Sequence, residues 1–327
     1  MKKLLLAAAL MLPAVAVLAQ APTGRGAQPA TPLASTRAAD GQAVVVSAEQ
    51  ITALAQRLRQ AYAAAATKPP NMREIIIEGT PYALGLEHRV GKANAAVHPG
   101  HAELMIVLEG SGVYTTGGSL VNPGALSTGA VPTITGSDIA NGTARNVAKG
   151  DMIMVPEGAT HMLLPDPGGP LLMATLHVPR RGTWAAPAAG GAPPKLIALA
   201  ADTPPMVADA RSRLPAAARF FAGGTLLSLS PYRVGLELRS PKGIASVHKN
   251  NAEFMYVIDG EGIIETGGTV INPRETATSI DGDSQQGAAV NRMKKGDFIF
   301  VPKGVPHLAR TDGHFLLATM HVPGDAP

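Results

Sequence analysis

The sequence predicts an all-β fold, a sandwich or a barrel, present in two tandem copies. Short runs rich in Val, Ile, Leu and Thr alternate with Gly, Pro and Asn at close intervals. This pattern is typical of short strands joined by tight turns. The chain also repeats itself after residue 70, and its 327 residues are enough for two domains with cores of their own.

Four pairs of segments carry the repeat, and each pair has its own pattern of polar and apolar residues. The pairs are PYALGLEHR from Pro81 with PYRVGLELR from Pro231, ELMIVLEG from Glu103 with EFMYVIDG from Glu253, KGDMIMVPEGATH ending at His161 with KGDFIFVPKGVPH ending at His307, and ATLHVP around His177 with ATMHVP around His321. The connectors between the segments differ much more than the segments do, which indicates two related domains.

The N-terminus predicts export. Lys2 and Lys3 precede a short apolar stretch, and Val17 and Ala19 fit a cleavage site before Gln20. We therefore interpret residues 1–19 as a secretory signal peptide, with an uncleaved N-terminal anchor as the alternative. The expected location is periplasmic or secreted, without a membrane partner once the signal is cleaved.

The remaining boundaries follow from composition. Residues 20–46 are rich in Ala, Pro, Gly and Thr and predict a flexible linker. The N-terminal domain is 47–179 and begins with a helix, because Ser47 and Gln50 fit a capping box and apolar residues follow at helical spacing up to a stop at Pro69-Pro70. An interdomain linker, 180–222, contains a weak helical stretch near 207–221 and leads to the C-terminal domain, 223–327.

Composition narrows the function. Charged residues make up 16% of the chain, the net charge is +4 and aromatic residues are 4%, which argues against nucleic acid as a partner. The absence of cysteine excludes disulfides, thiolate ligands and cysteine nucleophiles. The sequence contains no G-x-S-x-G, no P-loop and no H-E-x-x-H. The expected partner is therefore a small-molecule substrate. We expect the protein to be a monomer, which its two halves make a pseudo-dimer, or a homo-oligomer.

Two motifs in each half resemble those of the cupin superfamily. In the first half these residues are His98-Pro99, Glu103, Gly110, Gly150-Asp151, Pro156, Gly158 and His161; in the second they are His248, Glu253, Gly260, Gly296-Asp297, Pro302, Gly304 and His307. The chain thus resembles a bicupin. The resemblance implies two jelly-roll barrels, each a double-stranded β-helix, with metal ligands at the matching His and Glu positions.

The spacing makes chemical sense without the family. On a strand, alternate side chains share a face, so His98 can point into a barrel and Glu103 can re-enter the same cavity beyond the bend. His161 follows a Pro-x-Gly turn that brings in a third strand. Two imidazoles and a carboxylate form a facial triad that suits Fe, Mn, Cu, Zn or Ni, with positions left for water, dioxygen or substrate. We expect one divalent ion per domain, held by His98, Glu103 and His161 and by His248, Glu253 and His307.

The sequence departs from the family at one ligand. The cupin pattern has a histidine two residues before His98, but this chain has Ala96 there and Ser246 in the second copy. His101 is a candidate substitute ligand, although its counterpart is Asn251. The alternative to a metal site is a pair of metal-free barrels with hydrogen-bonded His and Glu, which is disfavoured because a buried carboxylate without a cation is costly.

Further repeated residues are open to two interpretations. His177 and His321 are either catalytic, as general acid/base or supporting groups in the cavity, or ordinary core histidines. The Glu87-x-Arg89 pair and its copy, Glu237-x-Arg239, form an ion pair on the outer sheet or place an arginine over a carboxylate substrate.

The function predicted from these features is that of an exported metal-dependent enzyme. Its substrate would be a small oxygen-rich molecule, such as a sugar acid or a phenolic or enolic carboxylate, and the facial triad favours dioxygenase or other oxidoreductase chemistry. The alternatives are a metal-dependent lyase or isomerase, or a non-catalytic bicupin that binds a sugar or a metal. The differences at positions 96/246 and 101/251 also allow one active and one structural barrel.

Overall fold

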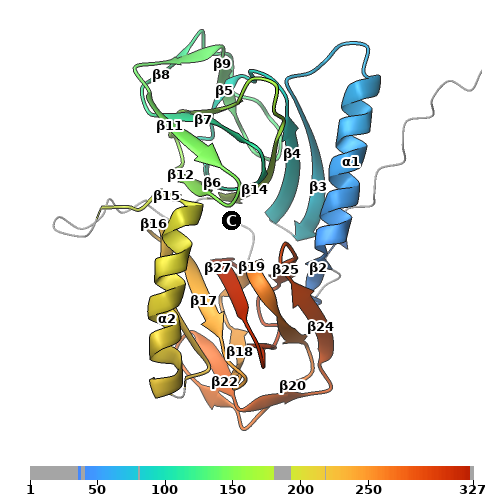
Figure 1. The fold of residues 1–327 in the computed structure, drawn as a ribbon, viewed down its shortest axis with the longest axis vertical. Coiled ribbons are helices and arrows are strands. Elements are labelled where there is room, and N and C mark those ends of the chain that lie inside the picture. Colours follow the sequence, from blue (N-terminus) through green and yellow to red (C-terminus); the bar gives the residue numbers. More distant parts are fainter. Residues whose placement is uncertain (1–35, 38–40, 80–81, 180–192, 218, 325–327) are drawn as a thin grey trace, which may run out of the picture. The chain divides into compact units, whose positions relative to one another are not determined.

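The two halves of the chain form two β-barrels built on the same plan (Figure 1). The computed structural model describes residues 36–37, 41–79, 82–179, 193–217 and 219–324. The predicted signal peptide, and most of the predicted 20–46 linker, lie outside these described residues. Within them, no helix is both long enough and apolar enough to cross a membrane.

The first barrel has a large sheet in the order β1-β3-β4-β14-β6-β12-β15, where β15 is Ile197–Ala198, a second in the order β11-β7-β13-β5-β9, and a small β8–β10 pair. Its strands are β3 (Asn71–Gly79), β4 (Tyr82–Arg89), β5 (Ala95–Val97), β6 (His101–Glu109), β7 (Ser111–Thr116), β8 (Ser119–Val121), β9 (Ile134–Gly136), β10 (Asp138–Ala140), β11 (Thr143–Ala148), β12 (Met152–Val155), β13 (His161–Pro165) and β14 (Leu171–Pro179), and β1 (Thr36–Arg37) lies beside β3.

The second barrel repeats this arrangement, with one long strand in place of β6 and β7. Its strands are β16 (Phe221–Leu229), β17 (Tyr232–Arg239), β18 (Ala245–His248), β19 (Asn251–Thr266), β20 (Thr269–Ile271), β21 (Arg274–Glu275), β22 (Ser279–Gly282), β23 (Ser284–Gln286), β24 (Ala289–Lys294), β25 (Phe298–Val301), β26 (His307–Arg310) and β27 (Phe315–Pro323). β19 pairs with β25 and β27 at its start and with β24 and β26 further along, so it crosses from one side of the barrel to the other.

A helix precedes each barrel. The helix α1 (Ala48–Ala64) starts where predicted: the Ser47 hydroxyl accepts the N–H of Gln50, and the Gln50 side chain accepts the N–H of Ser47. It ends at Ala64, upstream of the predicted stop at Pro69-Pro70, because the backbone of Ala65 is already extended. The second helix, α2 (Thr203–Ala217), follows a 3₁₀ turn (Ala200–Asp202) and begins earlier than the predicted 207–221.

Both predicted linkers contain ordered strands that pair with a strand of one of the barrels. β2 (Val44–Val46) falls inside the predicted 20–46 linker but pairs with β25 of the second barrel. β15 (Ile197–Ala198) falls inside the predicted 180–222 linker and pairs with β12 of the first barrel. Composition alone predicted flexible segments here because strands of two and three residues are too short to give a pattern, and their pairing partners are distant in sequence.

The two barrels share one apolar core and belong to one compact unit. Two equivalent tyrosines form hydrogen bonds between the barrels. The hydroxyl of Tyr232 donates to the carbonyl of Pro179 at 2.8 Å, and that of Tyr82 donates to the carbonyl of Pro323. Each copy of the P-Y motif thus binds the H-V-P motif of the other copy.

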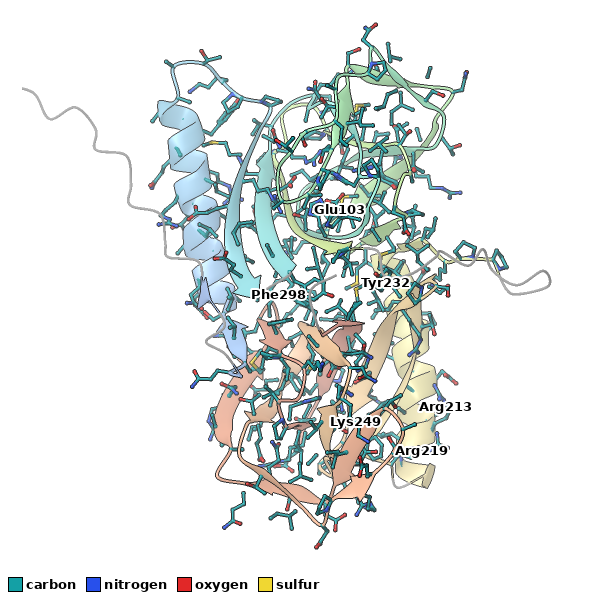
Figure 2. All side chains as sticks on the ribbon, turned by 180° about the vertical axis from the view of Figure 1, so that it is seen from behind. Glu103, Arg213, Arg219, Tyr232, Lys249 and Phe298 are labelled. Atoms are coloured by element: carbon teal, nitrogen blue, oxygen red, sulfur yellow. The ribbon has the colours of Figure 1, made fainter. Side chains whose placement is uncertain are left out.

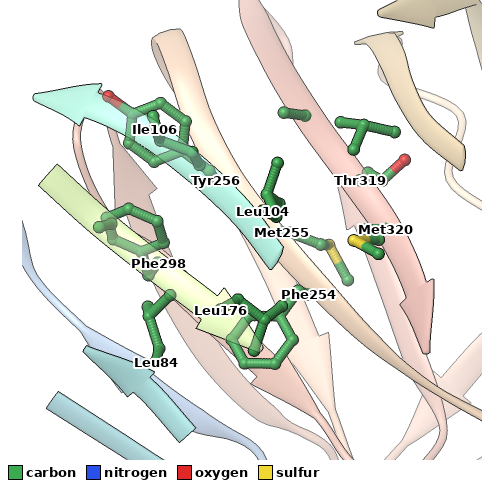
Figure 3. Close-up of a pocket in the computed structure, with 13 residues that line it drawn as sticks. Leu84, Leu104, Ile106, Leu176, Phe254, Met255, Tyr256, Phe298, Thr319 and Met320 are labelled. Carbon is green, nitrogen blue, oxygen red and sulfur yellow. The ribbon is translucent and has the colours of Figure 1, made fainter. Parts of the chain in front are cut away.

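Figure 3 shows the small cavity that remains where the two barrels meet. It holds about 20 Å³ and is lined by apolar side chains that include Leu104, Phe254 and Phe298. Because a space of this size admits about one water molecule and offers it almost no polar partner, it is a packing defect and not a ligand site.

Candidate metal centres

In the first barrel, the three predicted ligands converge on one point. The Oε2 of Glu103 lies 3.2 Å from Nε2 of His161 and 3.6 Å from Nε2 of His98. All three side chains are buried, with Glu103 only 3% exposed. Figure 2 shows Glu103 enclosed by the strands of its barrel. The structure therefore brings together the set that the sequence predicts.

Backbone contacts hold these residues in place. His98 directly follows β5, Glu103 lies on β6, and His161 opens β13. The N–H of Gly158 donates to the carbonyl of His98 at 2.9 Å, and Gly158 has a φ of +74°, which favours glycine. The Pro-x-Gly turn thus ties the strand of the third ligand to the first ligand.

The second barrel reproduces this arrangement. The Oε2 of Glu253 lies 3.0 Å from Nε2 of His307 and 3.3 Å from Nε2 of His248. The N–H of Gly304 donates to the carbonyl of His248 at 3.0 Å. All six predicted ligands therefore lie in two matching clusters.

A further histidine joins each cluster. Nε2 of His177 lies 3.5 Å from Oε1 of Glu103, and Nε2 of His321 lies 3.8 Å from Oε1 of Glu253. The rings of His98 and His177 are nearly perpendicular, with centroids 4.7 Å apart. Both histidines therefore belong to the sites, and the core-histidine interpretation is wrong for them.

Hydrogen bonds fix which ring nitrogen of the ligands is free. A backbone carbonyl only accepts, so the contacts of His161 Nδ1 with the carbonyl of Ala159 and of His307 Nδ1 with that of Val305, both 3.1 Å, put the proton on Nδ1. The Thr133 hydroxyl donates to the carbonyl of Val131 and so accepts from His98 Nδ1 at 2.9 Å. In each case Nε2 is left with its lone pair directed at the glutamate.

This donor set fits a divalent metal ion. Lone pairs of imidazole nitrogens and a carboxylate repel one another at 3.0–3.6 Å unless a cation lies among them. A single carboxylate neutralises only one of several imidazolium charges, whereas one divalent ion satisfies all the donors together. Two groups of described side chains have donor atoms that all lie within 4.8 Å of one another and could hold a metal ion: His98, Glu103 and His177 in the first barrel, and His248, Glu253 and His307 in the second.

The electrostatics of the clusters point the same way. Burial raises the pKa of Glu103, but the imidazoles of His177, His161 and His98 outweigh burial and hold this pKa well below its usual range. Burial likewise raises the pKa of Glu253, and the nearby imidazoles of His248 and His307 lower this pKa further than burial raises it. Both glutamates are thus carboxylates at neutral pH, as metal ligands must be.

The fourth histidines are neutral at the same pH. Burial lowers the pKa of His177 to about 4, although Glu103 opposes the shift. Burial also lowers the pKa of His321, against the opposing charge of Glu253. A neutral imidazole needs to release no proton before it coordinates a metal.

The first cluster opens into a cavity of about 1010 Å³. Besides the cluster itself, its lining includes Arg73, Glu87, Arg89, Ala96 and His101. This volume is large enough for a small organic molecule next to the cluster.

The Glu87–Arg89 pair lies in this cavity and not on the outer sheet, so that part of the prediction is wrong. Nη2 of Arg89 donates to Glu87 at 2.8 Å, and Nη1 donates to the carbonyl of Leu163. Glu87 is only 5% exposed. The pair is an ion pair, as one interpretation had it, and its arginine is already committed to protein partners.

Arg73 is a residue of this cavity that the sequence did not reveal. Its Nε lies 3.5 Å from Glu87, and about a third of its side chain (34%) is exposed. Its guanidinium lies on Gly85, where a Cβ would come within 2.6 Å of Nε. A comparison of the two halves does not reveal Arg73, because the second half has glycine at the equivalent position. Arg73 is the strand partner of Glu87, whereas Gly223 is the strand partner of Glu237.

The second cluster is more exposed than the first. The His321 side chain is 44% exposed against 9% for His177, and that of His248 is 22% against 11% for His98. His321 borders a separate cavity of about 600 Å³ that is also lined by Gly223, Arg213, Arg219 and Arg233. The two sites are therefore unequal, as the sequence differences suggested.

The positions that depart from the cupin pattern do not supply a donor to the clusters. Ala96 lines the cavity but has no donor atom, and the Ser246 hydroxyl donates to Asp281 at 2.8 Å. His101 also lines the cavity, but among the described side chains the group of donor atoms within 4.8 Å of one another contains His98, Glu103 and His177 and does not contain His101. His161 is outside this group as well, although its Nε2 lies 3.2 Å from Oε2 of Glu103. The predicted swing of His101 into the first site is thus not seen.

Comparisons with known proteins identify the fold. No protein-family model matches the sequence, and no curated protein matches it. Salicylate 1,2-dioxygenase from Pseudaminobacter salicylatoxidans is similar in structure, with 13% identity, a TM-score of 0.56 and coverage of 87% of this chain and 85% of that one. Its adduct with gentisate gives a TM-score of 0.57 at 13% identity, covering 86% and 81%.

At this identity the likeness concerns the fold and not the activity. It agrees with the mostly antiparallel sheets and with the two matching barrels. The chain therefore has the cupin fold, in two tandem jelly-roll barrels.

Proposed function

We propose that this chain is an exported, metal-dependent bicupin enzyme that acts on a small oxygen-rich carboxylate, by dioxygenase or related oxidoreductase chemistry. One observation carries the proposal: a buried His/Glu cluster able to bind metal faces a cavity of about 1010 Å³ that also contains a cationic side chain, Arg73. A metal held there would supply a Lewis acid with positions free for dioxygen and for substrate oxygens.

The residues of the cavity have separable tasks. Glu87 sits between Arg89 and Arg73, at 2.8 Å and 3.5 Å, and keeps both guanidinium groups near the cluster. Arg89 donates hydrogen bonds to the carboxylate of Glu87 and to the carbonyl of Leu163. The side chain of Arg73, in contrast, is partly exposed. Arg73 would thus bind the substrate carboxylate and orient the molecule towards the cluster.

Two further facts support a carboxylate substrate and oxygen chemistry. The cavity places a positive charge near a set of neutral and anionic ligands, which favours an anion that bridges the two. One structural neighbour, at 14% identity and a TM-score of 0.55, is a salicylate 1,2-dioxygenase in complex with gentisate, which is a small molecule. Export rests on the N-terminal sequence of residues 1–19 alone.

The test is oxygen consumption by the purified protein loaded in turn with Fe(II), Mn(II), Cu(II), Zn(II) and Ni(II), across a panel of phenolic carboxylates and sugar acids. We expect turnover with at least one phenolic or enolic carboxylate, lost in the Glu103→Ala variant. Product formation without oxygen uptake would instead identify a lyase or isomerase. Substrate binding without any product would identify a non-catalytic binding protein.

A further inference from the structure

The fourth donor in each cluster comes from the strand beside the glutamate. β14 runs antiparallel to β6, and His177 is the direct partner of Glu103 in that register. β27 runs antiparallel to β19, and His321 is the direct partner of Glu253. Directly opposite residues place their Cβ atoms about 4.5–5.5 Å apart on the same face. The sheet register therefore delivers each histidine to its glutamate.

Several pairs of donor atoms have the spacing of neighbouring ligands around one ion. With metal–nitrogen bonds of about 2.0–2.1 Å, neighbouring donors are separated by about 2.9 Å in an octahedron and 3.4 Å in a tetrahedron. Nε2 of His321 lies 3.1 Å from Nε2 of His248, which is itself 3.3 Å from Glu253. Nε2 of His177 lies 3.5 Å from Glu103, close to the 3.2 Å of His161.

Ala96 and Ser246 stand where the cupin pattern has a histidine ligand, and His177 and His321 can supply the donor atom that is missing there. Ala96 has no donor, and Ser246 is engaged by Asp281, so the strands that carry His98 and His248 each provide one donor. Ala96 is opposite His161 in the β5–β13 pairing and lines the same cavity. A second histidine at residue 96 would thus lie in the same cavity as the cluster and His177.

We propose that His177 and His321 are metal ligands, and that each completes a set of three histidines and one glutamate in place of the missing histidine at position 96 or 246. This inference rests on the proposed metal site but not on the proposed reaction. It replaces the predicted acid–base role, since an Nε2 atom bound to a metal has no lone pair left for a proton.

The two sites then differ in exposure and not in ligands. His177 is nearly buried, whereas 44% of the His321 side chain is exposed. Water reaches the second site more easily, so the second ion should exchange faster with a chelator than the first.

The experiment measures metal binding directly. Full-length mature protein is titrated with Cu(II), and the number of bound ions and their affinities are obtained by calorimetry. Pulsed electron paramagnetic resonance then counts the coordinated imidazole nitrogens. The variants are His177→Asn and His321→Asn, and His101→Asn is the matched control, a histidine in the same cavity but outside the cluster.

Wild-type protein and His101→Asn are expected to bind two ions, each with three imidazoles. His177→Asn and His321→Asn should each weaken one site at least 100-fold and lower its imidazole count to two. Unchanged affinity and three imidazoles in both variants would overturn the inference. If the variants lost turnover but kept both, the two histidines would instead act as general acid/base groups. Wild-type protein that binds no ion would instead refute the proposed metal site itself, which keeps the two failures distinct.

Discussion

The carboxylate of Asp297, in the second barrel, accepts the backbone N–H of Ala48 at the start of helix α1, at 2.7 Å. The first barrel returns the contact, because Asp151 accepts the N–H of Ala200 at 2.7 Å. The two aspartates belong to the pairs Gly150-Asp151 and Gly296-Asp297, which precede the candidate ligands His161 and His307 in the chain. Asp297 of the second barrel thus holds the start of the helix that precedes the first barrel, and Asp151 of the first barrel holds the turn that leads into the second.

This exchange predicts that the two barrels unfold together. Asp297→Ala removes the acceptor for Ala48 and also the one for the N–H of Lys294 at 2.8 Å. Leaving two donors without partners should lower the free energy of unfolding by about 2–4 kcal/mol. Urea denaturation should show a single transition, displaced to lower urea, with a similar shift in Asp151→Ala. Two separate transitions would show that the barrels are independent.

The metal stoichiometry of the glutamate variants tests the ligand sets. We expect about two ions per chain in the wild type, and Glu103→Ala and Glu253→Ala should each remove about one, since each glutamate contacts only the histidines of its own cluster. Elemental analysis after loading and desalting measures this. An unchanged count in either variant would mean that its ligands are misassigned.

A histidine placed at the position of the cupin pattern should substitute for His177. The double variant Ala96→His/His177→Asn is expected to bind its first-site ion at least about 10-fold more tightly than His177→Asn, because residue 96 borders the same cavity as His98. Ser246→His/His321→Asn is the matched pair in the second barrel. Calorimetry compares each double variant with its single parent, and equal affinities would contradict the expected exchange.

The metal-free protein should become less stable as the pH falls from about 6.5 to about 4. Burial lowers the pKa of His177 from 6.5 to about 4, so in this window the unfolded chain binds a proton that the folded protein does not. The loss should reach about 3 kcal/mol at the acid end. The lowered pKa of Glu103 adds in the same direction below pH 4.5.

Urea unfolding of chelator-treated protein at pH 7.5, 6 and 5 measures this loss. His177→Asn should lose less stability over the same range, since the titrating group is gone. A wild-type stability that stays flat between pH 7 and 5 would show that His177 keeps an ordinary pKa in the folded protein.

The position of Arg73 should govern substrate affinity. A methyl group at residue 85 would come within 2.6 Å of Nε of Arg73, so Gly85→Ala should displace the guanidinium without altering the strand. Both Gly85→Ala and Arg73→Gln are expected to weaken binding of the carboxylate substrate by about 10-fold or more and to leave metal content unchanged. Gly235→Ala, the matching glycine of the second barrel, is the control, and equal effects of all three would remove Arg73 from the substrate site.

Local pattern was enough to predict the all-β fold, the start of helix α1 and the His, Glu and His residues that each half repeats. Ser47 and Gln50 determine the helix start through contacts three residues apart, and His98 and Glu103 are separated by one bend. The linker prediction failed at Val44–Val46, because that segment is ordered only by pairing with Phe298–Phe300. Arg73 was missed because the repeat has Gly223 at its place.

By itself the sequence determined that the chain contains the same β unit twice and that each unit repeats two imidazoles and one carboxylate, since each ligand lies in a short motif that is recognised from neighbouring residues. Only the tertiary structure decided which distant strands become neighbours. That choice places His177 opposite Glu103 and His321 opposite Glu253, and it ties Tyr82 and Tyr232 to the ends of the opposite barrels. The physical reason is that sheet register pairs residues across long loops, and the order of residues along the chain does not reveal that pairing.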